Sequence, residues 1–510
     1  MPEILLATLN AKYIHASFGL RYLLANMGDL QDRTALVEFD INQRVVDIAE
    51  ALLTHDPRII GLGVYIWNAQ QTSELVQVLK RVAPEVTLIL GGPEVSYESH
   101  EQAVCQAADF VITGEADLKF AEVCRGVLRG EPPAGKIVAA ELPALESVSL
   151  PYALYDDRDL ATRVVYVEAS RGCPFTCEFC LSSLEIPVRA FALEPFLAEM
   201  EALLGRGLKH FKFVDRTFNL NLNTSKAILE FFLSRYQPGH FYHFEMVPDR
   251  LPEALREVIA RFPPGALQFE VGIQTFNPDV STRIKRRQNY DRLADNLRFL
   301  RTQTGVHIHA DLIAGLPGET IESFAAGFDQ LVALGPQEIQ LGILKRLRGT
   351  PIVRHDTEWE MVYSATPPYE LLRSKTLSFA GMQRMRRFAR HWDLVVNSGN
   401  FHEAASLIWR NADSAFHAFS AWSDWLYAQM GRNHNIALNT LGEVLFTYLT
   451  RERALDPEPV ANAIYRDYLR VGRSDKPALF RAYITVPDRP EQSSPPKSLK
   501  RQSRHAAAAS

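Results

Sequence analysis

The chain has 510 residues, of which 47% are hydrophobic and 23% charged, and its formal net charge is −5. This length predicts two or three domains with the composition of a soluble globular protein. The negative balance disfavours binding to nucleic acid or to a membrane surface. The first residues lack a signal-peptide pattern and no apolar run is long enough to cross a bilayer, so we expect a cytoplasmic protein.

Residues 1–130 alternate short apolar runs with amphipathic stretches. The runs are EILLATL, TALVEFDI, RIIGLGVYI, TLILGG and DFVITGE. Strands that alternate with helices predict an α/β fold, and this spacing indicates a flavodoxin-like doubly wound domain with a parallel sheet. Cys105 and Cys124 lie in the amphipathic stretches, where we expect both thiols to be buried.

Polar and glycine residues gather where these predicted strands end. Ligands of doubly wound domains bind at that edge of the sheet. A glycine commonly just ends a strand, but their grouping at one edge indicates a site for a large flat or phosphate-bearing ligand. The residues of this edge that we single out are Asn10, Tyr65, Gly91, Gly92, Gly114 and Glu115.

The remaining chain divides into four segments. Residues 131–160 are proline-rich and weakly periodic, which predicts a linker. Residues 161–350 alternate again, and six predicted β/α units indicate a partial barrel whose chemistry lies where strands end. Residues 351–484 show a mainly helical pattern. Residues 485–510 are poor in apolar residues and rich in Pro and Ser, so we expect a disordered tail.

The segment RGCPFTCEFC places Cys173, Cys177 and Cys180 directly after the first predicted barrel strand. Three thiolates can hold three irons of a cubane cluster, whose fourth iron then accepts another ligand. A structural zinc site requires four ligands, and neither a second cysteine pair nor a histidine follows closely. A redox pair of Cys177 and Cys180 leaves Cys173 without a role. The spacing favours an open iron–sulfur cluster over zinc, a redox pair or chance.

The same segment resembles the cluster motif of the radical SAM superfamily. FVDRTFN, FEMVPD, EVGIQTFN and DLIAGLPGET follow at the ends of later predicted strands, in the order of that family. The resemblance implies a 4Fe-4S cluster that binds S-adenosylmethionine (SAM) and cleaves it reductively to a 5'-deoxyadenosyl radical. It also implies a reductant such as flavodoxin or ferredoxin.

The resemblance further implies which side chains meet SAM. Phe179, just before the third cysteine, would lie beside the adenine. The polar positions that line the SAM pocket in barrels of the coproporphyrinogen-dehydrogenase type correspond to Glu245, Gln274, Arg286 and Asp311. An ion pair of Glu245 with Arg286 and a helix cap at Asp311 are the structural alternatives. The GGE-type motif that many members carry after the second strand is replaced here by VDRTFN.

A doubly wound domain ahead of such a barrel resembles the cobalamin-binding class of radical SAM enzymes. LILGGPEVSYE and ADFVITGEAD resemble the last strands of its cobalamin domain, which implies that the strand-end residues named above border the corrin. The D-x-H-x-x-G motif that supplies a histidine to cobalt is absent from the sequence, and we do not expect His15 to replace it. A first domain that binds substrate instead of cobalamin is the alternative.

The commonest chemistry of this class is methyl transfer to an unactivated centre, which we expect here. Cyclisation or rearrangement, and a non-catalytic iron–sulfur regulatory protein, are the alternatives. The carboxy-terminal segment resembles a domain of unestablished role. Tyr363, Tyr369 and Trp392 are candidate substrate contacts there, although aromatic residues at helical spacing more often belong to a core. The sequence does not specify the substrate.

Overall fold

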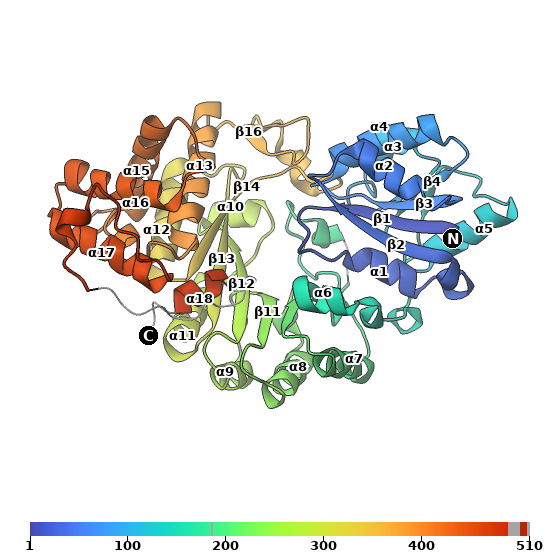
Figure 1. Ribbon diagram of the computed structural model, residues 1–510, viewed down its shortest axis with the longest axis horizontal. Coiled ribbons are helices and arrows are strands. Elements are labelled where there is room, and N and C mark those ends of the chain that lie inside the picture. Colours follow the sequence, from blue (N-terminus) through green and yellow to red (C-terminus); the bar gives the residue numbers. More distant parts are fainter. Residues whose placement is uncertain (185–186, 488–499, 507–510) are drawn as a thin grey trace.

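The computed structural model describes residues 1–184, 187–487 and 500–506. The chain forms two lobes, each built on a six-stranded sheet, and a helical carboxy-terminal segment packs on the second lobe (Figure 1). The described helices include none with the length and apolar character needed to span a bilayer. The α/β class predicted from the sequence is confirmed.

The first sheet has the order β2-β1-β3-β4-β5-β6, and all its pairings are parallel. Its strands are β1 (Ile4–Asn10), β2 (Thr34–Asp40), β3 (Ile59–Gly63), β4 (Thr87–Gly91), β5 (Phe110–Thr113) and β6 (Ile137–Ala139). The order of the first five strands is the flavodoxin-like one. β6 differs from the prediction, because it adds a sixth strand within the stretch that we expected to be a linker.

Alternate residues of β1 pack into two separate cores, one on each face of this sheet. Leu5 and Ala7 pack with α2 (Val45–Leu53), α3 (Ala69–Val82) and α4 (Ala103–Ala107), whereas Ile4 and Leu6 pack with α1 (Phe18–Ala25) and α5 (Lys119–Arg129). Cys105 and Cys124 are buried in these two cores, as expected.

The second sheet has the order β14-β13-β12-β11-β10-β7, again with parallel pairings throughout. Its strands are β7 (Val165–Val167), β10 (His210–Phe213), β11 (Phe241–Met246), β12 (Leu267–Gln274), β13 (His307–Ala314) and β14 (Glu338–Ile343). The helices between them are α7 (Leu193–Gly205), α8 (Leu222–Ser234), α9 (Glu253–Ala260), α10 (Pro278–Arg283), α11 (Tyr290–Gln303) and α12 (Ile321–Leu334). β7 and β14 are the sheet's two edges, so the barrel is partial, as predicted.

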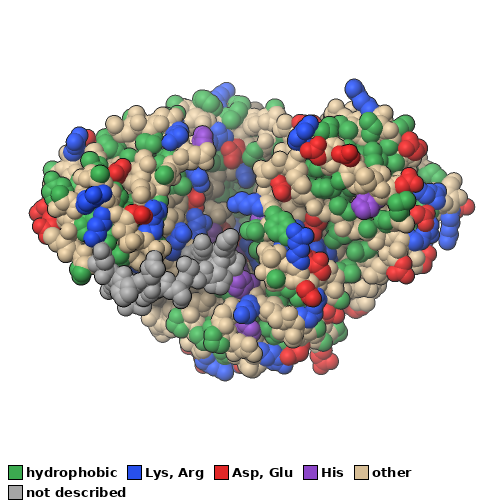
Figure 2. Space-filling view, in the orientation of Figure 1, with side chains coloured by type: hydrophobic (Ala, Val, Ile, Leu, Met, Phe, Trp, Pro, Cys, Tyr) green, Lys and Arg blue, Asp and Glu red, His purple; other side chains and the backbone are tan. Residues whose placement is uncertain are grey.

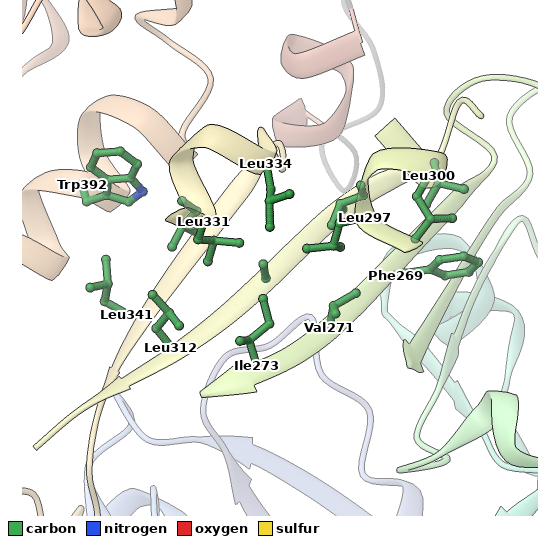
Figure 3. Packing of buried hydrophobic residues seen from close by; sticks show 14 of the residues in the cluster. Phe269, Val271, Ile273, Leu297, Leu300, Leu312, Leu331, Leu334, Leu341 and Trp392 are labelled. Atoms are coloured by element: carbon green, nitrogen blue, oxygen red, sulfur yellow. The ribbon is translucent and has the colours of Figure 1, made fainter. Parts of the chain in front are cut away.

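Alternation along β12 separates the two faces of this sheet. Phe269, Val271 and Ile273 are buried and lie toward leucines of α11 and α12 (Figure 3). The intervening Glu270 and Gln274 line a cavity on the other side. The sequence thus builds an apolar outer layer and a polar interior from one strand.

The carboxy-terminal segment shares the barrel's core. It contains α13 (Phe379–Trp392), α14 (His402–Ser406), α15 (Ala415–Met430), α16 (Leu438–Thr447) and α17 (Pro457–Arg470), and a short antiparallel pair, β15 (Val362–Tyr363) with β16 (Leu371–Arg373). The rings of Trp392 and of Phe328 on α12 have centroids 4.8 Å apart. Trp392 is therefore a core residue.

A last helix, α18 (Lys500–Ala506), lies in the tail that we predicted to be disordered. It packs over the amino-terminal ends of barrel strands. Arg501 Nη1 lies 3.2 Å from the carboxylate of Glu338 on β14, and the Gln502 amide donates to Gln268 on β12. These contacts with polar residues far away in the sequence stabilise α18, although the segment itself is polar. The rest of the predicted tail, 488–499 and 507–510, lies outside the described residues.

Candidate functional site: two adjoining cavities

The three predicted cluster ligands lie together on one loop, which follows the short strand β8 (Ser170–Arg171). Cys173, Cys177 and Cys180 all line a cavity of about 340 Å³ at the carboxyl ends of the barrel strands, which we call the cysteine cavity. The Cys180 N–H donates to the Cys177 carbonyl at 3.1 Å, which closes the turn between them. The loop therefore brings the three thiols together, as their spacing predicted.

Burial raises the pKa of the Cys173 and Cys177 thiols, and thiolates are the form that binds metal. Arg286 opposes this effect, because its Nη1 lies 3.6 Å from the Cys177 sulfur. No three His, Cys, Asp or Glu side chains of the described chain converge closely enough to hold a single ion. A cubane cluster meets each cysteine at a different iron and so needs a wider spacing. The all-thiol donor set fits such a cluster.

The side chains predicted to contact SAM line this same cavity. The set comprises Phe179, Glu245, Gln274, Arg286 and Asp311. Gln274 has a φ of +73°, and the β12–β13 register shifts between Gly272 and Gln274, where the strand ends. Arg286 donates to the carbonyls of Gly272 and Ile273, so it also fixes this strand end. Burial raises the pKa of Asp311 well above its usual range, with Glu270 and Glu245 adding to the effect.

The inner face of the barrel next to this cavity is ionic. Glu270 lies 3.0 Å from His243 Nε2 and 3.4 Å from Lys212 Nζ. Burial opposes ionisation of Glu270, but these two neighbours hold its pKa well below its usual range. The cavity thus brings a carboxyl of raised pKa, Asp311, near a carboxylate of lowered pKa, Glu270. Such an interior suits a polar molecule rather than a hydrocarbon.

The VDRTFN segment, which stands in place of the GGE-type motif, holds the base of the cysteine loop. Asp215 is 2% exposed, and its carboxylate accepts from Ala169 N at 3.0 Å and from Ser170 Oγ at 2.6 Å. Arg216 instead pairs with Glu245 at 2.9 Å. The structural alternative that paired Glu245 with Arg286 is thus replaced by a pair with Arg216.

Glu178 is a functional residue that sequence reasoning missed. It lies between two cluster cysteines, is 1% exposed, and its carboxylate meets Lys285 at 3.2 Å, Arg354 at 2.9 Å and His355 at 2.5 Å. These partners come from segments more than a hundred residues away in the chain. Glu178 therefore anchors the cysteine loop to the rest of the second lobe.

A second cavity, of about 590 Å³, lies at the carboxyl ends of the first sheet. We call it the glycine cavity, because its wall includes Gly19, Gly61, Gly63, Gly91, Gly92 and Gly114. Tyr65 and Glu115 also line it, as predicted from the sequence. Asn10 is not among its lining residues, since its amide instead donates to Glu38 at 2.9 Å.

Two of these glycines admit no side chain. A Cβ on Gly92, whose φ is +107°, would lie 2.5 Å from the Val64 carbonyl oxygen, and one on Gly61 would lie 2.6 Å from the ring of Phe120. The rings of Tyr65 and Trp67 stack at 4.5 Å beside this wall. Bare backbone next to flat rings fits a large flat group such as a corrin.

Two further candidates from the sequence, Tyr363 and Tyr369, do not line either cavity, and neither does His15, which we did not expect to bind cobalt. His15 lies between the lobes, with its Nδ1 2.6 Å from the Tyr166 hydroxyl. Tyr369 donates to Glu94 at 2.6 Å, and the Tyr363 hydroxyl lies 3.5 Å from the Met361 sulfur.

The two cavities adjoin each other. Ser182, from the cysteine loop, and Arg216, just beyond β10, line both of them. Figure 2 shows the surface hollowed between the two lobes, with basic side chains and histidines along the hollow. A ligand of the first lobe and a ligand of the barrel would therefore face each other.

Three families match successive parts of the chain. Residues 4–124 match the B12 binding domain, residues 167–331 match the radical SAM superfamily, and residues 357–505 match a protein family of unknown function (DUF4080). The match to the first two families coincides with the glycine cavity and the cysteine cavity.

The similar proteins include a methyltransferase and two enzymes whose names join cobalamin with radical SAM chemistry. An uncharacterized methyltransferase of Pyrococcus horikoshii is 25% identical over 60% of this chain and 71% of its own length. The cobalamin-dependent radical SAM methyltransferase TokK of Streptomyces tokunonensis is 24% identical over 62% of this chain, which spans about half, 52%, of that protein. The structure of the cobalamin-dependent SAM radical enzyme OxsB superposes with a TM-score of 0.61 at 14% identity, over 92% of this chain and 79% of that one. This last likeness concerns the fold.

The fold and the two cavities define a radical SAM barrel joined to a B12-binding domain. The chain is similar to cobalamin-dependent radical SAM enzymes, with a B12-binding domain at residues 4–124 and a radical SAM domain at residues 167–331. Its cofactors are accordingly a 4Fe-4S cluster, SAM and cobalamin.

Proposed function

We propose that this enzyme transfers a methyl group to an unactivated centre of a polar substrate held between the two lobes. The observation that carries the proposal is the junction of the glycine cavity with the cysteine cavity through Ser182 and Arg216. A methyl donor in one cavity and a radical generator in the other would then act on the same substrate atom, which is catalysis by positioning. The methyltransferase names of two of the relatives agree with this reading.

Cys173, Cys177 and Cys180 would hold a cluster that supplies the electron for reductive cleavage of SAM, and the first lobe would hold cobalamin as the methyl donor. The residues of the chain bind and orient these partners. We assign Cys173, Cys177 and Cys180 to the cluster, and Phe179 to the adenine face. We also assign Asp311 to the SAM pocket, where burial raises the pKa of its carboxyl.

The polar wall divides between SAM and the substrate. We assign Glu245, Gln274 and Arg286 to SAM, because all three line the cysteine cavity beside the cluster loop. Glu270, which lines the same cavity, would then meet the substrate. Tyr65, Glu115 and the glycines of the first lobe border the corrin in this assignment, whereas Asn10 lies outside the lining of the glycine cavity and binds Glu38.

The test is to purify the protein without oxygen from cells supplied with cobalamin, and to incubate it with SAM and dithionite. We expect near-stoichiometric cobalamin, and both 5'-deoxyadenosine and S-adenosylhomocysteine as products. A Cys177→Ala variant should lose cluster absorbance and 5'-deoxyadenosine, whereas Cys124→Ala, buried in the first lobe, should keep both.

Two outcomes would contradict the proposal. Protein that holds the cluster but no cobalamin, even after reconstitution, would make the first lobe a substrate-binding domain. Cobalamin with 5'-deoxyadenosine, but with no methylated product from deuteromethyl-SAM in extracts of the producing cells, would favour cyclisation or rearrangement.

A further inference from the structure

Arg171, two residues before the first cluster cysteine, joins the lobes. Its Nη1 lies 2.9 Å from both Glu115 and Asp117, its Nη2 lies 3.0 Å from Asp117, and its Nε lies 2.8 Å from Glu168. Glu115 and Asp117 belong to the loop after β5 in the first lobe. The arginine side chain is 12% exposed, so these contacts are largely shielded from water.

Two aromatic rings confine the same guanidinium group. Its carbon lies 4.5 Å from the centroid of Tyr22 and 5.5 Å from that of Phe191. Arg189 of β9 (Arg189–Ala190) pairs with Arg171 across a short antiparallel ladder and also binds Glu115. Planar arginine forks that bind carboxylates in two-point fashion fix orientation as well as distance. We call this group the Arg171 cluster.

A second group of the same kind joins the lobes through the loop after β4. Arg348 lies 3.0 Å from Glu94 and from Glu98, and its Nη2 donates to the Tyr369 hydroxyl at 3.1 Å. Arg346 also binds Glu98, at 3.2 Å. Glu94 is 5% exposed. We call this group the Arg348 cluster.

The two clusters act on adjacent loops at the rim of the glycine cavity. Glu94 and Glu115 both line that cavity, and they follow the neighbouring strands β4 and β5. Arg171 begins the cysteine loop, and Arg348 follows the last barrel strand. Two separate attachment points on one rim resist both translation and rotation of the first lobe against the barrel.

We propose that the Arg171 and Arg348 clusters set the distance and orientation between cobalamin and the iron–sulfur cluster, so that Arg171 and Arg348 are positioning residues for methyl transfer. This inference rests on the proposed function, since it concerns the alignment of those two cofactors. Glu115 lines the glycine cavity, where we expect the corrin, and also takes part in this junction. Its carboxylate is bound to two arginines of the barrel lobe.

The test uses the two paramagnetic centres of the reduced holoenzyme, cob(II)alamin and the 4Fe-4S cluster. Their magnetic coupling in electron paramagnetic resonance depends steeply on separation and orientation. We expect a resolved coupling in the wild type, and its loss or broadening in Arg171→Met and in Arg348→Met, with both cofactors retained. Arg171→Lys, which keeps the charge but not the fork, should restore it in part.

The matched control is Arg256→Met. Arg256 is 18% exposed, binds Asp295 and Asn296, and lies 4.8 Å from the ring of Phe299, but all these partners lie within the barrel lobe. Its loss should leave the coupling unchanged. An unchanged magnetic coupling in both Arg171→Met and Arg348→Met would overturn the inference. So would loss of cobalamin with an unchanged distance between lobes, which would make these arginines cobalamin ligands.

A second measurement needs no cofactor. Genetically encoded nitroxides at Val82 and Leu222, which are 61% and 38% exposed on the two lobes, report the distance between them. The distance distribution should be narrow in the wild type and in Arg256→Met, and broad in Arg171→Met. A narrow distribution in Arg171→Met would overturn the inference. If the wild-type protein binds no cobalamin, the proposed function is contradicted. The nitroxide distance still tests whether Arg171 fixes the two lobes.

Discussion

At the scale of single residues, Glu319 is a buried carboxyl whose shifted pKa can be tested without a substrate. It lies between β13 and α12, is 2% exposed, and accepts a hydrogen bond from Thr275 Oγ1 at 2.6 Å. Burial raises its pKa from 4.5 to about 7. Between pH 4.5 and about pH 7, Glu319 is therefore protonated in the folded protein but ionised in the unfolded chain.

Stability should consequently fall as pH rises through about 7. From pH 6 to pH 8 we expect this group to cost about 1 kcal/mol of unfolding free energy. Urea unfolding of Glu319→Gln should lack this part of the pH dependence. Glu322→Gln, on the exposed first turn of the same helix, should keep the wild-type profile. An identical slope in wild type and Glu319→Gln would contradict the assignment.

The residues found from the sequence are those whose signal is local. Cys173, Cys177 and Cys180 stand within one short segment, and their spacing alone indicated a cluster. The role of Glu178 was not predictable, because it depends on partners from distant segments that only folding brings to the loop. Asn10 shows the reverse case, since its place at a strand end was correct but its amide is bound to Glu38.

Among the secondary-structure elements, long strands with clear alternation were predictable and short or polar elements were not. All six barrel strands lie at the predicted runs, because each carries its own apolar pattern. β6 has three residues and forms by pairing with β5. α18 is polar, and contacts with Gln268 and Glu338 at the far end of the barrel stabilise it.

The contribution of α18 can be measured by deletion. Removal of residues 500–510 should lower the unfolding free energy by ~1–3 kcal/mol, because the buried carboxylate of Glu338 loses Arg501 and keeps His307 at 2.9 Å. Arg501→Gln should reproduce part of that loss. Arg473→Gln, whose partner Asp475 is half exposed, is the control and should change stability little. Equal stability of the deleted and full chains would show that α18 does not support the barrel.

The molecule as a whole is held together across its lobes by buried charge. Besides the Arg171 and Arg348 clusters, Glu38 of β2 binds Arg21 at 3.0 Å and Arg163 at 2.7 Å, and Asp159 binds the same two arginines. All four side chains are less than a tenth exposed. This junction fixes the first lobe to the helix α6 (Asp157–Thr162) that leads into the barrel.

Glu38→Gln should therefore destabilise the protein by about 3 kcal/mol, because two buried guanidinium groups lose a charge partner. Glu3→Gln is the matched control, since Glu3 pairs with Arg33 at the surface and its loss should change stability little. Urea or thermal unfolding of both variants measures the difference. A similar loss of unfolding free energy in the two variants would show that burial of the Glu38 junction does not increase its contribution to stability.

The anchoring of the cysteine loop by Glu178 has a consequence for what happens when oxygen destroys the cluster. Its three cationic partners and the bond from its own N–H to the Ile284 carbonyl, at 3.0 Å, belong to the polypeptide. Oxidative loss of the iron would not remove any of these contacts of Glu178. We therefore expect the cysteine loop to keep its position after the cluster is lost, so that iron and sulfide can rebuild a cluster in the same chain.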